Sequence, residues 1–503
     1  MDKKKSVSKI SSKENPLKKS LNEKMSRRSA LSTAAKVATG VIISGVVAGV
    51  GGYLAGSSQA PGKTVTVEKT VEKTVTAPGA TTTVTGPGAK ETVTKTVTST
   101  LTVSPTQAAA VKWPYKYRVW VPIVNEFMTY DEIADAIAKE GSITIADWTY
   151  WGLTDTYFIP SFKEYVKDKF GVDIDVKIVG TQEAKGGFMY QLYSAYKAGL
   201  AAPYDAMHIE VNFFQEAIAK EVAEPFLPSP LVPNLVHVDP VFFQDYLPYG
   251  VQFQQHALCA PVVNLDHAGW IKSWLDFADP RLKGKITLWS MSDNGFWAFL
   301  ATVAYALGYD YKKPDEMNKA IEWVAKNVHP NVLKYTSDES EIIQLSENNI
   351  TWITCYWCCS YEMEQAAGNT WLGRRLLEPF MPNLPGVVWI PKKVQHPILA
   401  QLYVDWLLSK EFQFPDINGP GFKDLSPTEA KKVWAGMTEG PLGPYYEQFI
   451  PDWWGGKDKY YQVFPTLEDY KKYIYPSMKI LDWTYINEHA SEWVSYYQKL
   501  IGG

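Results

Sequence analysis

Residues 142–212 alternate between short apolar stretches and amphipathic stretches, and this order constrains the fold more than any other feature of the chain. Residues 143–146 alternate between apolar and polar side chains, which predicts a strand that runs into the aromatic-rich turn DWTYWG. Residues 158–170 repeat large apolar side chains at helical spacing before Gly171, which predicts a helix with a glycine C-cap. The pattern continues with a predicted strand at 172–180, a helix at 187–200 and a strand at 204–212. Such alternation indicates an α/β fold with a parallel sheet, whose ligands bind at the carboxyl ends of the strands.

The N-terminal residues have a different character from this folded region. Residues 1–25 are polar and rich in lysine, which is typical of a segment that stays on the cytoplasmic side of a membrane. Arg27 and Arg28 then precede an uncharged stretch at 37–55, so residues 26–56 are interpreted as a signal-anchor or as a twin-arginine-like export signal. Either segment would place the remaining chain on the extracellular side of the cytoplasmic membrane.

Residues 57–112 form a linker that is rich in threonine, proline and glycine and has almost no large apolar side chains. Such a composition cannot bury a hydrophobic core, and we expect a disordered stalk. The stalk would hold the folded part, which begins at about residue 113, clear of the membrane surface.

The overall composition excludes several classes of protein. A length of 503 residues exceeds what one hydrophobic core supports, so two lobes are expected. The 50 basic and 54 acidic residues nearly balance, which argues against nucleic acid as a partner. No G-x-S-x-G, H-E-x-x-H, Walker or G-x-G-x-x-G motif occurs, which removes the commonest enzyme signatures.

The four cysteines do not predict a metal site. Cys355 and Cys358 have C-x-x-C spacing, but a second ligand pair at short spacing is missing, so neither a metal nor a cofactor is expected. A buried strand end or an extracellular disulfide is the expected role of these cysteines.

Several stretches together resemble one known family. Residues 273–288, SWLDFADPRLKGKITL, are similar without a gap to the pattern S-W-x-D-L-x-D-P-x-[LF]-K-G-K-I-x-[LV], with Phe277 in place of its leucine. Residues 160–180 resemble an F-x-x-x-x-G-[IV]-x-V helix and strand, and residues 398–413 resemble a late helix with the pattern D-[FW]-L-L-S-x-E-x-Q. The chain between about 143 and 413 thus resembles the extracellular solute-binding proteins of ABC importers, in the branch that includes polyamine-binding and ferric-iron-binding members.

The resemblance implies a two-lobed fold of the periplasmic-binding-protein type, joined by crossing hinge strands. The first lobe would contain residues 113–258 and 385–440, and the second would contain residues 259–384 and 441–503. It further implies a solute captured between the lobes, an ABC permease with its ATPase as partners, and no enzymatic activity. A membrane anchor would keep such a receptor at the cell surface.

The candidate ligand residues are rings, carboxylates and amides that follow the predicted strands. They are Trp148, Tyr150, Trp151, Glu210, Asn212, Asp293, Asn294, Trp297, Tyr356, Trp357 and Trp389. By the resemblance, six of them stand where polyamine-type proteins carry cleft residues: Trp148, Tyr150, Trp151, Glu210, Asp293 and Trp357.

This mixture of side chains suits an organic cation such as a polyamine. A ring face attracts an ammonium group by about 0.5–2 kcal/mol, and a carboxylate accepts its hydrogen bonds. Two departures from the polyamine pattern keep a sugar as the alternative solute: Glu210 replaces a small hydroxyl residue, and residues 381–393 lack the expected E-G pair. Tryptophan rings would stack on such a sugar.

Two other classes compete with a binding protein. A secreted glycoside hydrolase would use two of the carboxylates as acid and nucleophile, and an adhesive surface protein would use the stalk. The pattern at 273–288 and the order of strands and helices favour the binding protein over both.

Overall fold

The computed structural model describes residues 81–83, 92–94, 115–148, 152–180, 187–255, 261–355 and 358–502. Residues 45–116 form a unit of their own, in which strands β1 (Thr81–Thr83) and β2 (Thr92–Thr94) pair antiparallel. These strands consist of β-branched residues, which favour strands, and the rest of the predicted stalk at 57–112 lies outside the described residues. No helix in the described part of the chain is long and apolar enough to span a membrane. The predicted signal or anchor at 26–56 lies outside the described residues.

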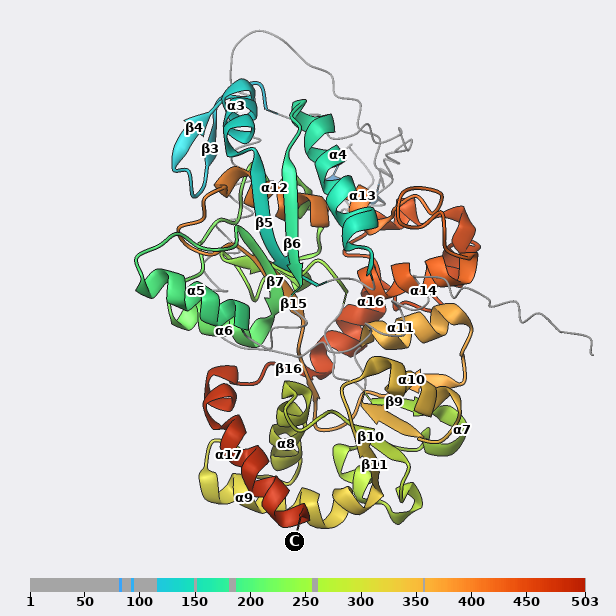
Figure 1. Cartoon of the computed structure of the whole chain (residues 1–503). Helices are drawn as coiled ribbons and strands as arrows, with labels where there is room; N and C mark the ends of the chain where they lie inside the picture. The colour runs from blue at the N-terminus through green and yellow to red at the C-terminus, as the bar shows by residue number, and fades with distance from the viewer. Residues whose placement is uncertain are drawn as a thin grey trace, which may run out of the picture. The chain divides into compact units, whose positions relative to one another are not determined.

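A five-stranded sheet forms the first layer of the larger unit (Figure 1). Its strands, in order across the sheet, are β6 (Asp175–Gly180), β5 (Ser142–Asp147), β7 (Ala206–Glu210), β15 (Gly386–Trp389) and β8 (Gly250–Val251). Strand β5 is parallel to both β6 and β7, which confirms the parallel sheet predicted for this region. Strand β15 runs antiparallel to β7 and β8.

A second five-stranded sheet is built from the middle of the chain. Its strands, in order, are β11 (Val332–Tyr335), β10 (Ile286–Leu288), β12 (Ile353–Cys355), β9 (Pro261–Asn264) and β13 (Leu372–Arg374). Strand β10 is parallel to β11 and β12, whereas β9 is antiparallel to β12 and β13. A separate two-stranded sheet pairs β14 (Met381–Pro382), which lies between β13 and β15 in the sequence, in parallel with β16 (Met478–Lys479), which precedes α17.

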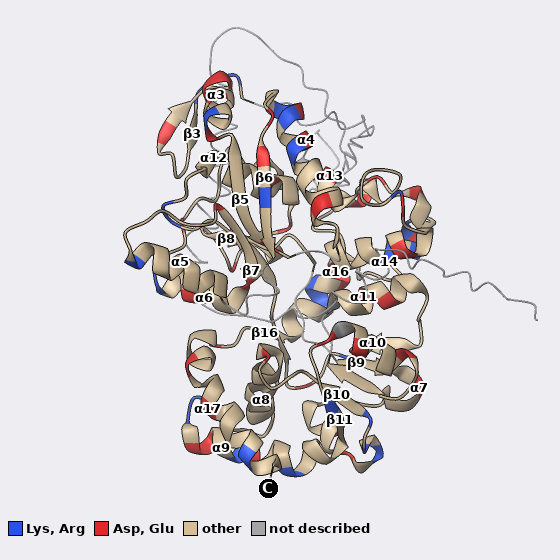
Figure 2. Ribbon diagram, in the orientation of Figure 1, with Lys and Arg blue, Asp and Glu red and all other residues tan. Residues whose placement is uncertain are grey.

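The helices connect and cover these sheets. They are α3 (Tyr130–Glu140), α4 (Ile159–Phe170), α5 (Gly187–Lys197), α6 (Val211–Ala219), α7 (Leu265–Ala268), α8 (Asn294–Ala306), α9 (Pro314–Trp323), α10 (Glu339–Glu347), α11 (Cys358–Ala367), α12 (Pro397–Leu407), α13 (Lys410–Gln413), α14 (Pro427–Thr438), α15 (Lys457–Tyr460), α16 (Leu467–Asp469) and α17 (Trp483–Ile501). Helix α4 buries its periodic apolar residues and ends at Gly171, whose φ of 71° is left-handed, so the predicted glycine C-cap is confirmed. Charged residues of both signs share the outer helices, as on α4 and α9 (Figure 2).

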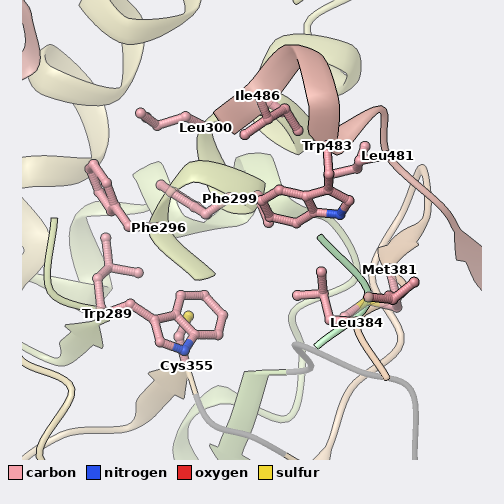
Figure 3. Close-up of a cluster of buried hydrophobic side chains, with 14 of the residues drawn as sticks. Trp289, Phe296, Phe299, Leu300, Cys355, Met381, Leu384, Leu481, Trp483 and Ile486 are labelled. Carbon is pink, nitrogen blue, oxygen red and sulfur yellow. The ribbon is translucent and has the colours of Figure 1, made fainter. Parts of the chain in front are cut away.

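The second sheet packs on a cluster of large apolar side chains (Figure 3). Trp289 follows β10, Phe299 lies on α8, and Trp483 begins α17, and all three are buried. A Cβ atom at Gly295 would lie 2.7 Å from the ring of Trp289, so only glycine lets α8 begin this close to the indole. The cluster thereby fixes where α8 starts relative to the end of β10.

Glu140 gives the fold a dependence on pH. Its two carboxyl oxygens accept the backbone N–H groups of Ile398 and Leu399 at 3.0 and 2.9 Å, and burial raises its pKa from 4.5 to about 7. Because the folded state then holds the proton more tightly than the unfolded state, this stabilisation is complete below pH 4.5 and is lost as the pH rises through about 7. Relative to Glu140→Gln, we expect the wild-type free energy of unfolding to fall by about 3 kcal/mol across that range. Urea unfolding at a series of pH values measures this, and a difference that does not vary with pH would contradict it.

Candidate functional site

The carboxyl edge of the first sheet gathers three of the candidate ligand residues. Strands β5 and β7 are parallel neighbours, so Trp148, which follows β5, and Glu210, which ends β7, lie at the same edge. Asn212 follows in the first turn of α6. The three side chains are only 4%, 5% and 1% exposed, respectively. The edge is therefore lined by a ring, a carboxyl and an amide that are almost fully enclosed.

A buried hydrogen-bond network around Asp147 holds this edge in place. Asp147 is fully buried, and its Oδ1 accepts the backbone N–H of Trp148 at 2.6 Å and Nδ1–H of His208 at 2.8 Å. Its Oδ2 accepts the hydroxyl of Tyr403 on α12. A Cβ atom at Gly386 would lie 2.3 Å from Nε2 of His208, so the backbone of β15 closes tightly over the imidazole. The carboxylate of Asp147 thus links β5, β7 and α12.

The carboxyl edge of the second sheet holds three further candidates, which follow β10. Asp293 is the N-cap of α8: its Oδ1 accepts the backbone N–H of Gly295 at 2.8 Å, and its Oδ2 accepts the hydroxyl of Ser337 at 2.9 Å. Asn294 is buried in the first turn of the same helix. Trp297 is half-buried, and its Nε1 donates to the carbonyl of Met291 at 2.9 Å. Both carboxyl oxygens of Asp293 therefore already have partners within the protein.

Asp293 can be tested as a helix cap. Because alanine cannot accept the Gly295 N–H, Asp293→Ala is expected to lower the free energy of unfolding by about 1–2 kcal/mol. Asparagine is an equally good N-cap, so Asp293→Asn should retain most of that stability. Urea unfolding of the two variants beside the wild type makes the comparison. An equal loss in both variants would show that the charge, and not the cap, stabilises this site.

Trp389 lies away from the other candidates. Strand β15 is antiparallel to β7, and Trp389 pairs with Met207 while Gly386 pairs with Glu210 at the carboxyl edge. The indole is fully buried and packs edge-on to Phe214 with ring centroids 6.2 Å apart. Ligands bind at the carboxyl ends of the parallel strands. Because β15 is antiparallel, its own carboxyl end, where Trp389 lies, is at the opposite edge of the sheet, and Trp389 has the position of a core residue. The remaining candidates, Tyr150, Trp151, Tyr356 and Trp357, lie outside the described residues.

Sequence reasoning missed three amides near this edge, of which Gln215 and Asn383 are buried and Asn487 is half-buried. Gln215 on α6 is 1% exposed, Asn383 before β15 is 4% exposed, and Asn487 on α17 accepts a hydrogen bond from Nδ2 of Asn212 at 3.3 Å. Asn212 and Gln215 are three residues apart in the helix VNFFQEAIA, whose only other polar residue is Glu216, and this spacing was a usable signal. The other two amides lie far away in the sequence and gave no local signal.

Cys355 occupies a buried strand end, which is one of the two roles expected for the cysteines. It is the last residue of β12 and is 1% exposed. Burial raises the pKa of its thiol well above the usual 9.0. In the described part of the chain, no group of three His, Cys, Asp or Glu side chains is arranged to hold a metal ion.

Comparison with known proteins identifies the fold. No family model matches the sequence, and no curated protein gives a significant match. Among solved structures, the spermidine/putrescine ABC transporter substrate-binding protein PotD from Streptococcus pneumoniae is similar, with a TM-score of 0.51 and 14% identity over 72% of this chain and 99% of that one. A candidate spermidine/putrescine ABC transporter from Listeria monocytogenes has a TM-score of 0.50 and 14% identity over 71% and 99% of the two chains. A candidate extracellular solute-binding protein from Bordetella parapertussis has a TM-score of 0.50 and 13% identity over 72% and 99%.

These similarities establish a class of fold. All three solved structures are covered almost completely, so this chain contains their whole fold. The mixed α/β fold of the periplasmic-binding-protein type that the sequence predicts is thereby confirmed. At these identities the likeness is one of architecture, and the solute is a separate question.

Proposed function

We propose that this chain is an extracellular solute-binding protein, which captures a small solute between two lobes and delivers it unchanged to an ABC-type permease driven by a cytoplasmic ATPase. The single observation that carries the proposal is the shared fold. In this chain, rings, amides and two carboxyls lie at the carboxyl edges of the two sheets. Ligands of open α/β sheets bind at such edges. Trp148, Glu210 and Asn212 would contact the solute from the first sheet, and Asn294 and Trp297 would contact it from the second.

The N-terminal segments would keep the receptor at the cell surface. We propose that residues 1–25 remain cytoplasmic, that residues 26–56 anchor or export the chain, and that residues 57–112 give the binding unit reach. Tethering raises the effective concentration of a receptor at its permease.

An organic cation such as a polyamine is the solute class that the sequence favours. Trp148 would offer a ring face to an ammonium group, and Glu210 would accept its hydrogen bonds. One observation favours the alternative, a sugar or another neutral solute: the carboxyl oxygens of Asp147 and Asp293 are already bound by protein groups. A protein that uses its carboxylates internally has fewer of them to offer a cation.

Thermal unfolding of the full chain tests the receptor function. Spermidine, putrescine, thiamine, maltose and ferric citrate would each be added in excess, because a solute that binds only the folded state raises the unfolding midpoint by mass action. At 100 times its dissociation constant, a solute should add about 2.7 kcal/mol of stability. For a cationic solute, Glu210→Ala should remove the shift. A solute that is degraded during the experiment would instead support a secreted hydrolase and contradict the proposal.

A further inference from the structure

Three segments that are far apart in the sequence meet beside the carboxyl edge of the first sheet. The backbone N–H of Val211, the first residue of α6, donates to the carbonyl of Pro385 at 3.1 Å. The backbone N–H of Asn383 donates to the carbonyl of Lys479 at 2.8 Å, just before α17. Leu384 and Trp483 lie in one apolar cluster (Figure 3). The start of α6, residues 383–385 and the start of α17 are therefore neighbours.

Amide side chains gather at this junction. Nδ2 of Asn212 donates to Oδ1 of Asn487 at 3.3 Å, which joins α6 to α17. Gln215 lies one helical turn after Asn212, so it is on the same face of α6. Asn383 contributes a fourth amide from the segment between β14 and β15. Asn212, Gln215 and Asn383 are 1%, 1% and 4% exposed.

These enclosed amides carry polar atoms that hydrogen-bond to no described residue. The atoms are Oδ1 of Asn212, both Nε2 and Oε1 of Gln215, and Oδ1 of Asn383. A buried polar atom without a partner is costly, and native proteins satisfy nearly all such atoms with protein, ordered water or ligand. The set combines one donor group with three acceptors and belongs entirely to uncharged side chains. A partner with hydroxyl or amide groups, which both donate and accept, is complementary to it.

We propose that Asn212, Gln215 and Asn383 contact the bound solute and select a neutral compound that carries several hydroxyl or amide groups. This inference rests on the proposed solute-binding function and narrows its solute class. It also assigns a role to α17, which packs on α8 and α9 and meets α6 through Asn487. The solute would take the place of the missing hydrogen-bond partners where α6 and α17 meet.

Titration calorimetry of the full chain tests the inference, with maltose, myo-inositol and N-acetylglucosamine as neutral probes and spermidine and choline as cationic probes. We expect binding of a neutral probe. Gln215→Met should weaken that binding about tenfold, which corresponds to about 1.4 kcal/mol, because methionine keeps the shape of glutamine but removes its hydrogen bonds. The thermal midpoint of the unliganded variant should be unchanged or higher, since the substitution removes polar atoms that lack partners.

Gln413 provides a matched control. It is also 1% exposed, but its Nε2 donates to the carbonyls of Phe253 and Leu407 at 2.9 and 2.8 Å. Gln413→Met should therefore lower the thermal midpoint and leave the affinity for the neutral probe within about twofold.

The other outcomes separate the two proposals. If a neutral probe binds equally well to the wild type, to Gln215→Met and to Asn383→Leu, the assignment of these residues is overturned. If only spermidine or choline binds, the neutral solute class is overturned and the receptor function stands. If no probe of either class binds, both proposals fail.

Discussion

Asp147→Ala is expected to lower the free energy of unfolding by about 3–5 kcal/mol, the loss that follows when one partner of a buried, hydrogen-bonded charge network is removed. The variant would leave Nδ1 of His208, the hydroxyl of Tyr403 and the N–H of Trp148 without their acceptor. His208 is as fully buried as Asp147, so bulk solvent does not reach the groups that lose their bonds. Tryptophan fluorescence during urea unfolding would measure the change.

A histidine–carboxylate pair on the surface of α17, His489 and Glu492, is the control for this experiment. Nδ1 of His489 lies 3.7 Å from Oε2 of Glu492, whose side chain is 71% exposed. Glu492→Ala should change the stability little, because solvent screens such pairs. A loss for Asp147→Ala as small as that of the control would show that the network does not support the edge of the first sheet.

Asp405→Ala is expected to lower the free energy of unfolding by a similar amount, about 3–5 kcal/mol. The substitution would leave the largely buried Lys169 without its counter-charge. Asp405 on α12 is fully buried, and its Oδ2 accepts Nζ of Lys169 at 2.8 Å and the hydroxyl of Tyr165 at 2.6 Å, both from α4. Its Oδ1 accepts the backbone N–H of Asn234 at 2.8 Å. The carboxylate therefore fastens α4 and the segment at Asn234 to α12.

Helix α4, which carries Lys169, also supplies the control for Asp405. Nζ of Lys167 on α4 lies 2.8 Å from the carboxylate of Asp173, but their side chains are 57% and 76% exposed. Asp173→Ala should therefore leave the urea midpoint close to that of the wild type. If Asp405→Ala and Asp173→Ala lose similar amounts of stability, the explanation is contradicted, because it attributes the large contribution of Asp405 to burial and not to the ion pair itself.

Local features of the fold could be predicted from the sequence. The apolar spacing of residues 158–170 predicted the buried face of α4, and Gly171 predicted its end, because both depend on neighbours within one or two turns. The alternation at 143–146 predicted β5, and the strand–helix order predicted its parallel neighbours. Aspartate directly before a helix commonly caps it, and Asp293 does so through Oδ1, while its Oδ2 accepts the hydroxyl of Ser337.

The candidate site was harder to predict because its parts depend on topology. Trp389 was a candidate because it ends a predicted strand, but β15 runs antiparallel to β7 and Trp389 pairs with Met207, at the opposite end from Glu210. The amides of Asn212 and Asn487 are 275 residues apart, and only the packing of α6 against α17 brings them together. The spacing of residues along the sequence carries no information about such pairs. They become visible only when the hydrogen-bond partners of buried polar groups are traced in the folded chain.

The most direct test of solute capture is a calorimetric titration of the full chain with each probe, followed by chemical analysis of the solute after the protein is denatured. The account predicts saturable binding of one class of small solute, with one site on each chain, and complete recovery of that solute in unchanged form. Conversion of the solute to a product, or the absence of saturable binding for neutral and cationic probes alike, would contradict it.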